Sequence, residues 1–171
     1  MRQQSGGLSG PPPACRGTVP SLLVTADDRA SFEALQSTIE GTVGLAVAPI
    51  GTEPVVQELG TIRGGVAWST IKVPLALAVA ARDPGERDEG LIDAALIVSD
   101  NDAALALWER LGPPEAAAAA VQDVLAAARD IATRVETQVL RAGFTPFGQT
   151  EWSLAAQVRL MAALPDLPHA D

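Results

Sequence analysis

Several residue types that carry common chemistries are nearly missing from this chain of 171 residues. It holds one cysteine, Cys15, and one histidine, His169, which excludes a disulfide framework and a metal cluster built on these side chains. A catalytic triad that uses histidine would depend on His169 near the chain end, where order is usually poor. No uncharged apolar run reaches membrane-spanning length. We expect no metal and no cofactor.

Positive charge is also scarce. The chain carries 12 basic and 21 acidic residues, a net charge of −9, and aromatic residues make up 4% of it. Without a basic stripe or aromatic side chains for stacking, a nucleic-acid partner is not expected. Lys72 is the only lysine, and all other basic residues are arginines. Arginine stays protonated and cannot serve as a base, so the single lysine stands out.

Lys72 follows Ser69 by three residues at the start of an apolar run. Positions three apart share a helix face, so the hydroxyl and the amine can meet in the first turn. A desolvated lysine has a lowered pKa and can take the proton of a serine nucleophile. Backbone N–H groups at the helix start would suit a developing oxyanion. The alternative is that Ser69 caps the helix and Lys72 is a surface charge.

Patterning predicts an α+β chain that is mostly helical. We assign residues 1–28, rich in Gly, Pro, Ser and Gln, to a disordered or linker segment. The expected elements are a helix over 29–40 capped by Asp27 or Asp28, an antiparallel hairpin over 43–48 and 55–60, the Ser69 helix, helices over 91–98, 102–111 and 115–132, a loop over 136–149, and a helix over 151–164 capped by Thr150.

A second motif, Ser99-Asp100-Asn101, lies between two of the expected helices. Because Ser, Asp and Asn all favour helix starts, the motif can be explained as a helix junction. Its distance from Ser69 supports a different interpretation, in which the two motifs form one site.

The two motifs together resemble those of the class A serine β-lactamase and penicillin-binding-protein superfamily. The matching pieces are Ser69-Thr70-Ile71-Lys72, Ser99-Asp100-Asn101 with the following Asp102-Ala103-Ala104-Leu105, and Leu111-Gly112. The resemblance covers roughly residues 30–165 and implies a β-lactamase-like helical domain with the first hairpin of its sheet.

The resemblance also implies roles for individual residues. Ser69 would attack a carbonyl and become acylated, and Lys72 would accept its proton directly or through water. Ser99 would pass a proton to the leaving nitrogen, and Asn101 would donate a hydrogen bond to the amide of the substrate. Asp100 would tie its loop to backbone amides. Glu136 is the candidate for activating the deacylating water, although its register departs from that of the family.

The sequence departs from the family pattern at a third motif. No lysine follows Lys72, so the Lys-Thr/Ser-Gly strand is missing, and we expect residues 29–171 to form an incomplete domain. Val43, Leu45 and Val47 alternate, which gives the first strand one apolar face. A lone hairpin is marginal in water, so a second chain or a further C-terminal segment is expected to complete the sheet.

The resemblance therefore implies a serine hydrolase that forms an acyl-enzyme at Ser69 with a β-lactam, or with a peptidoglycan-like or peptide-like amide. Two alternatives remain: a catalytically inactive envelope or interaction domain, and an esterase on the same scaffold. The resemblance implies an exported or cell-envelope location, without a recognisable export signal in the chain.

Overall fold

The computed structural model describes residues 24–51, 53–82 and 86–168, without the side chains of residues 86 and 87. It confirms a mostly helical α+β chain. The helices within this part are α1 Ala26–Gln36, α2 Lys72–Ala80, α3 Glu86–Ile97, α4 Asn101–Arg110, α5 Pro114–Ala127 and α6 Leu154–Ala163. The strands are β1 Gly44–Val47, β2 Gln57–Gly60, β3 Gly64–Val66 and β4 Glu151–Ser153. Short 3₁₀ turns are η1 Trp68–Ile71, η2 Phe147–Gln149 and η3 Leu164–Asp166.

Helix α2 is the centre of the helical part. It is apolar almost all round, which is the pattern of a helix surrounded by other helices. It contacts α3, α4 and α5, and Leu75 at its middle is fully buried. Small residues on α5, such as Ala117 and Ala118, are buried in the same core. This packing fixes the first turn of α2, where Lys72 lies.

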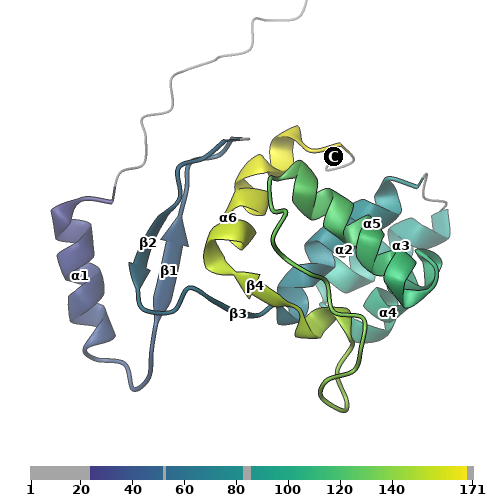
Figure 1. Cartoon of the computed structure of the whole chain (residues 1–171), viewed down its shortest axis with the longest axis horizontal. Helices are drawn as coiled ribbons and strands as arrows, with labels where there is room; N and C mark the ends of the chain where they lie inside the picture. The colour runs from purple at the N-terminus through teal and green to yellow at the C-terminus, as the bar shows by residue number, and fades with distance from the viewer. Residues whose placement is uncertain (1–23, 52, 83–85, 169–171) are drawn as a thin grey trace, which may run out of the picture.

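The predicted hairpin is confirmed: β1 pairs antiparallel with β2, and Leu45 lies opposite Leu59. Figure 1 shows the hairpin between α1 and α6, with α1 outermost, and the contacts run from α1 to β2 and from α6 to β1. Of the alternating side chains, Val43 and Val47 are half-buried while Leu45 is 42% exposed. Part of the apolar face is therefore uncovered, as the sequence predicted.

A second antiparallel pair, β3 with β4, was not anticipated from the sequence. Gly64 lies opposite Ser153, and a Cβ on Gly64 would come within 2.9 Å of the backbone of Trp152 and Ser153. The indole Nε1 of Trp152 donates to the buried carboxylate of Asp130, 2.9 Å away, just after α5. The β3–β4 pair thus joins the end of α5 to the strand that leads into η1.

The expected start of the last helix was wrong. Glu151, Trp152 and Ser153 are extended, and Ser153 caps α6 by accepting from the N–H of Ala156. Thr150, predicted as the cap, is fully buried, and its hydroxyl accepts from the N–H of Glu136. The residue before the apolar run is a serine, and strand pairing moves the helix start to it.

The first helix also begins earlier than expected. Thr25, not Asp27 or Asp28, is the cap of α1, and Asp28 completes a capping box with it. The helix therefore starts inside the segment 1–28 that the sequence assigned to a linker. The remaining part of that segment, with Cys15, lies outside the described residues, as does His169.

Helix α5 ends at Ala127, five residues before the predicted end. Arg129 follows with a φ of 64°, and the N–H of Asp130 returns to the carbonyl of Leu125. This left-handed turn is a common helix ending. No helix in the described part of the chain has the length and hydropathy needed to cross a membrane.

Candidate active site

Lys72 is the buried lysine of the candidate site. As the first residue of α2 it is only 4% exposed, so its interpretation as a surface charge is wrong. Its Nζ donates to the carbonyl oxygen of Ser99 at 2.5 Å, to the hydroxyl of Ser99 at 3.1 Å and to Oδ1 of Asn101 at 2.9 Å. The three N–H donors of the ammonium group therefore have three oxygen partners, all from the predicted second motif.

Ser69 lies in the 3₁₀ turn η1 just before α2, and its side chain is exposed. It does not cap a helix: neither η1 nor α2 has a side-chain cap. The preceding residue, Trp68, has a φ of 49°. This left-handed conformation is energetically unfavourable for a residue with a large side chain. Being in the first turn of η1, the N–H of Ser69 has no partner inside that turn and can serve as an oxyanion donor.

Ser99 connects the other two groups. Its hydroxyl donates to Oγ of Ser69 at 3.1 Å and accepts from Nζ of Lys72 at the same distance. Ser99 has a φ of 57°, so both hydroxyl-bearing turns contain a left-handed non-glycine residue, Trp68 in one and Ser99 in the other. Among the described residues no hydrogen bond joins the side chains of Ser69 and Lys72 directly, so the hydroxyl of Ser99 is the bridge between them.

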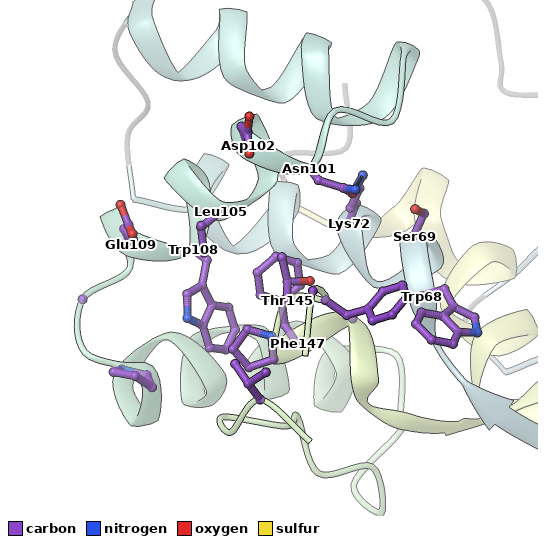
Figure 2. A pocket seen from close by; sticks show the side chains of 17 residues that line it. Trp68, Ser69, Lys72, Asn101, Asp102, Leu105, Trp108, Glu109, Thr145 and Phe147 are labelled. Atoms are coloured by element: carbon purple, nitrogen blue, oxygen red, sulfur yellow. Dashed lines mark hydrogen bonds between the residues drawn. The ribbon is translucent and has the colours of Figure 1, made fainter. Parts of the chain in front are cut away.

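Asp100 and Asn101 hold the second motif in place. The carboxylate of Asp100 caps α4 by accepting from the N–H of Ala103 at 2.8 Å, which confirms its expected structural role. Asn101 directs its Oδ1 to Lys72, so its Nδ2 donors remain for a ligand. Figure 2 shows the Asn101 and Lys72 side chains meeting, with Ser69 on the neighbouring turn.

These residues open into a cleft of about 780 Å³. Ser69, Lys72 and Asn101 line it, whereas Ser99 contributes only through its bonds to them. The other walls come from η1, α4, the start of α5 and the loop before β4. Two of the other lining residues are acidic, Asp102 and Glu109. The rest are mostly apolar or small: Trp68, Leu105, Trp108, Gly112, Pro114, Val139, Gly143, Phe144, Thr145, Pro146, Phe147 and Gly148.

Two aromatic pairs form walls that sequence reasoning missed. The rings of Trp68 and Phe144 are 4.9 Å apart between centroids, and those of Trp108 and Phe147 are 5.0 Å apart. Each pair joins segments far apart in the sequence, which no local pattern reveals. Gln149 holds the loop of the first pair by donating to the carbonyls of Phe144 and Thr145.

Glu136 is not part of this group. Its carboxylate accepts from the backbone N–H groups of Thr137 and Gln138, at 2.9 and 2.7 Å, and it does not line the cleft. Val139, from the same loop, does line it. The predicted deacylating role of Glu136 therefore has no support from its position.

Burial lowers the pKa of Lys72 from its ordinary value of 10.5, and the negative charge of Asp100 opposes this shift. Desolvation is the larger of the two causes. A lowered pKa increases the fraction of free amine near neutral pH, which is the form that can accept a proton.

Comparison with known proteins identifies no family for this chain. No protein-family model matches the chain, and a search of curated proteins finds no match. Within residues 24–51, 53–82 and 86–168, no cluster of three histidine, cysteine, aspartate or glutamate side chains is arranged to hold a metal ion. The functional interpretation therefore depends on the site itself.

Proposed function

We propose that this chain is a serine acyl-transfer enzyme of the β-lactamase and penicillin-binding-protein type, which forms an acyl-enzyme at Ser69 with a β-lactam or a peptide-like amide. The observation that supports it is the bridge made by Ser99, whose Oγ is 3.1 Å from both Oγ of Ser69 and Nζ of Lys72. Hydroxyl and amine groups at hydrogen-bond distance form a path for the proton that a serine nucleophile must lose.

The proposed reaction begins with a free amine on Lys72. Oγ of Ser69 attacks the carbonyl carbon as its proton moves to the hydroxyl of Ser99 and the proton of Ser99 moves to Lys72. The bond from the carbonyl carbon to the leaving nitrogen breaks, and the same path returns one proton to that nitrogen. Water then attacks the ester, which releases the acid and restores the Ser69 hydroxyl.

The last step is expected to be slow. The two carboxylates that line the cleft are Asp102 and Glu109 on α4, and neither forms a hydrogen bond to Ser69 or Lys72. Glu136 is occupied by backbone amides. Without a carboxylate beside the ester, water lacks a general base, so a persistent acyl-enzyme is favoured over rapid turnover.

One observation favours the second candidate, a non-catalytic domain. All three side-chain hydrogen bonds of Lys72 go to Ser99 and Asn101, and none goes to the hydroxyl of Ser69. A lysine used in this way could simply fasten the start of α2 to the turn before α4. In that case removing the amine would alter stability and leave no chemical consequence.

Covalent labelling separates the candidates. The chain is treated with a fluorescent penicillin and, separately, with a fluorophosphonate that carries no carboxylate, and the adduct is located by mass spectrometry. The proposal expects an adduct on Ser69 that Ser69→Ala abolishes and that Ser37→Ala, at an exposed serine after α1, retains. Absence of any adduct with both reagents would support the non-catalytic domain.

A further inference from the structure

The charged side chains around the cleft are distributed unevenly. Its charged lining residues are Lys72, Asp102 and Glu109. Lys72 is buried and committed to three oxygen acceptors, whereas Asp102 and Glu109 are exposed on one face of α4. A ligand in the cleft therefore meets two accessible negative charges, whereas the ammonium group of Lys72 is buried and its donors are directed to three neutral oxygens.

The side chain between the two carboxylates is apolar. Leu105 follows Asp102 by three residues and precedes Glu109 by four, so all three share one face of the helix. Trp108 and Phe147 form the wall below this face, as Figure 2 shows. The part of the cleft along α4 thus combines an aromatic and aliphatic surface with an acidic rim.

The aromatic pair beside Ser69 also suits a cation. Trp68 and Phe144 both line the cleft, and the negative quadrupole of an aromatic ring attracts ammonium, guanidinium and amidinium groups. Arg141 already lies over Phe144, with its guanidinium carbon 5.5 Å from the ring centroid, and it is not a lining residue. The net charge of −9 adds a weak electrostatic attraction between the protein and cations.

We propose that the cleft selects acyl compounds whose group lying along α4 is apolar or aromatic and carries no negative charge, with cationic groups preferred. This inference rests on the proposed function, because it assigns a substrate class to the Ser69 site. Asp102 and Glu109 are the residues that set the charge preference, and the aromatic walls set the preference for planar apolar groups.

Three isosteric esters test the preference: the p-nitrophenyl esters of phenylacetic acid with a para amidino, carbamoyl or carboxylate group. The value of kcat/KM reports acylation and is expected to fall in that order. Because Asp102 and Glu109 are partly solvated, we expect about a tenfold difference in kcat/KM between the cationic and the anionic ester. In the double variant Asp102→Asn and Glu109→Gln this ratio is expected to fall to about twofold or less.

A matched control removes two acidic charges elsewhere. Glu89 and Asp93 are exposed on α3 and do not line the cleft, so Glu89→Gln with Asp93→Asn is expected to keep the wild-type ratio. An anionic ester that reacts as fast as the cationic one would overturn the inference while leaving Ser69 as the nucleophile. So would a ratio that falls equally in both double variants.

A binding experiment keeps the inference falsifiable if no ester reacts and the proposed function fails. The Ser69→Ala variant is titrated with phenylacetamides that carry a para amidino, carbamoyl or carboxylate group, with tryptophan fluorescence as the signal, since Trp68 and Trp108 line the cleft. Tighter binding of the amidine, lost in the Asp102→Asn and Glu109→Gln background, supports the charge preference. Equal binding of amidine and carboxylate overturns it.

Discussion

The helical part of the molecule and the hairpin with α1 differ sharply in packing. In the helical part, Leu75, Leu107 and Leu125 are completely buried, and the core cluster runs through α2, α4, α5 and α6. In the other part, α1 has no buried residue and Leu59 is the buried side chain of the hairpin strands. The three site residues Ser69, Lys72 and Ser99 all lie in the well-packed helical part. The geometry of the site therefore depends little on how well the hairpin is covered.

The largest expected effect is a loss of reactivity at Ser69 with little change in the stability of the helical part. Lys72→Met should slow fluorophosphonate labelling of Ser69 about a thousandfold, because no other group in the site can take the proton. Its unfolding free energy in urea should change by about 1 kcal/mol or less, because methionine avoids the desolvation of a buried charge and the freed oxygens belong to Ser99 and Asn101, which are exposed residues. A variant that labels normally would exclude Lys72 as the base.

The second prediction compares equal substitutions in the two parts. Leu107→Ala should lower the unfolding free energy by about 3 kcal/mol, because it opens a cavity in a completely buried position. Leu35→Ala, in α1 and 57% exposed, should cost about 0.5 kcal/mol or less. Urea titrations of both variants measure the difference. Equal losses would show that α1 is packed against something that the chain alone does not provide.

The third prediction concerns the strand pair that joins the two parts. Gly64→Ala should destabilise the chain by about 2 kcal/mol, because the new Cβ would lie 2.9 Å from the backbone of β4. Gly65→Ala is the matched control, since a Cβ there meets no atom within 4 Å. Thermal melting of the two variants tests this. Similar melting temperatures would mean that β3 and β4 do not pair as described.

The smallest expected effect is the pH dependence, about tenfold per pH unit at most. Since burial lowers the pKa of Lys72, the labelling rate should rise with pH and level off below 10.5. Lys72 has a higher pKa in the unfolded chain than in the folded one. The unfolding free energy should therefore also rise with pH between the lowered pKa and 10.5. A rate that is independent of pH, or one that levels off only above 10.5, would contradict the burial argument.

The sequence predicted the features that depend on local patterns. The hairpin, the buried helix after Ser69 and the cap made by Asp100 all follow from short runs of residues. The contact of Ser99 with both Ser69 and Lys72 was expected only from the two motifs together, and the structure brings the three residues together.

The features that the sequence did not predict depend on contacts between distant segments. Gly64 to Val66 and Glu151 to Ser153 are too short and irregular to indicate strands, and they pair only because the fold brings them together. The same reason explains why the aromatic pair of Trp68 and Phe144 was missed. The bond from Trp152 to Asp130 likewise spans 22 positions, beyond any local pattern.

The proposed path, in which the hydroxyl of Ser99 carries the proton from Ser69 to Lys72, can be tested with the single substitution Ser99→Gly. Glycine accepts the φ of 57° without strain, so this variant removes the hydroxyl while keeping the backbone carbonyl that Lys72 contacts. We expect unchanged or slightly higher stability and a labelling rate of Ser69 that falls about a hundredfold. A variant that folds normally and labels at the wild-type rate would exclude Ser99 as the proton carrier.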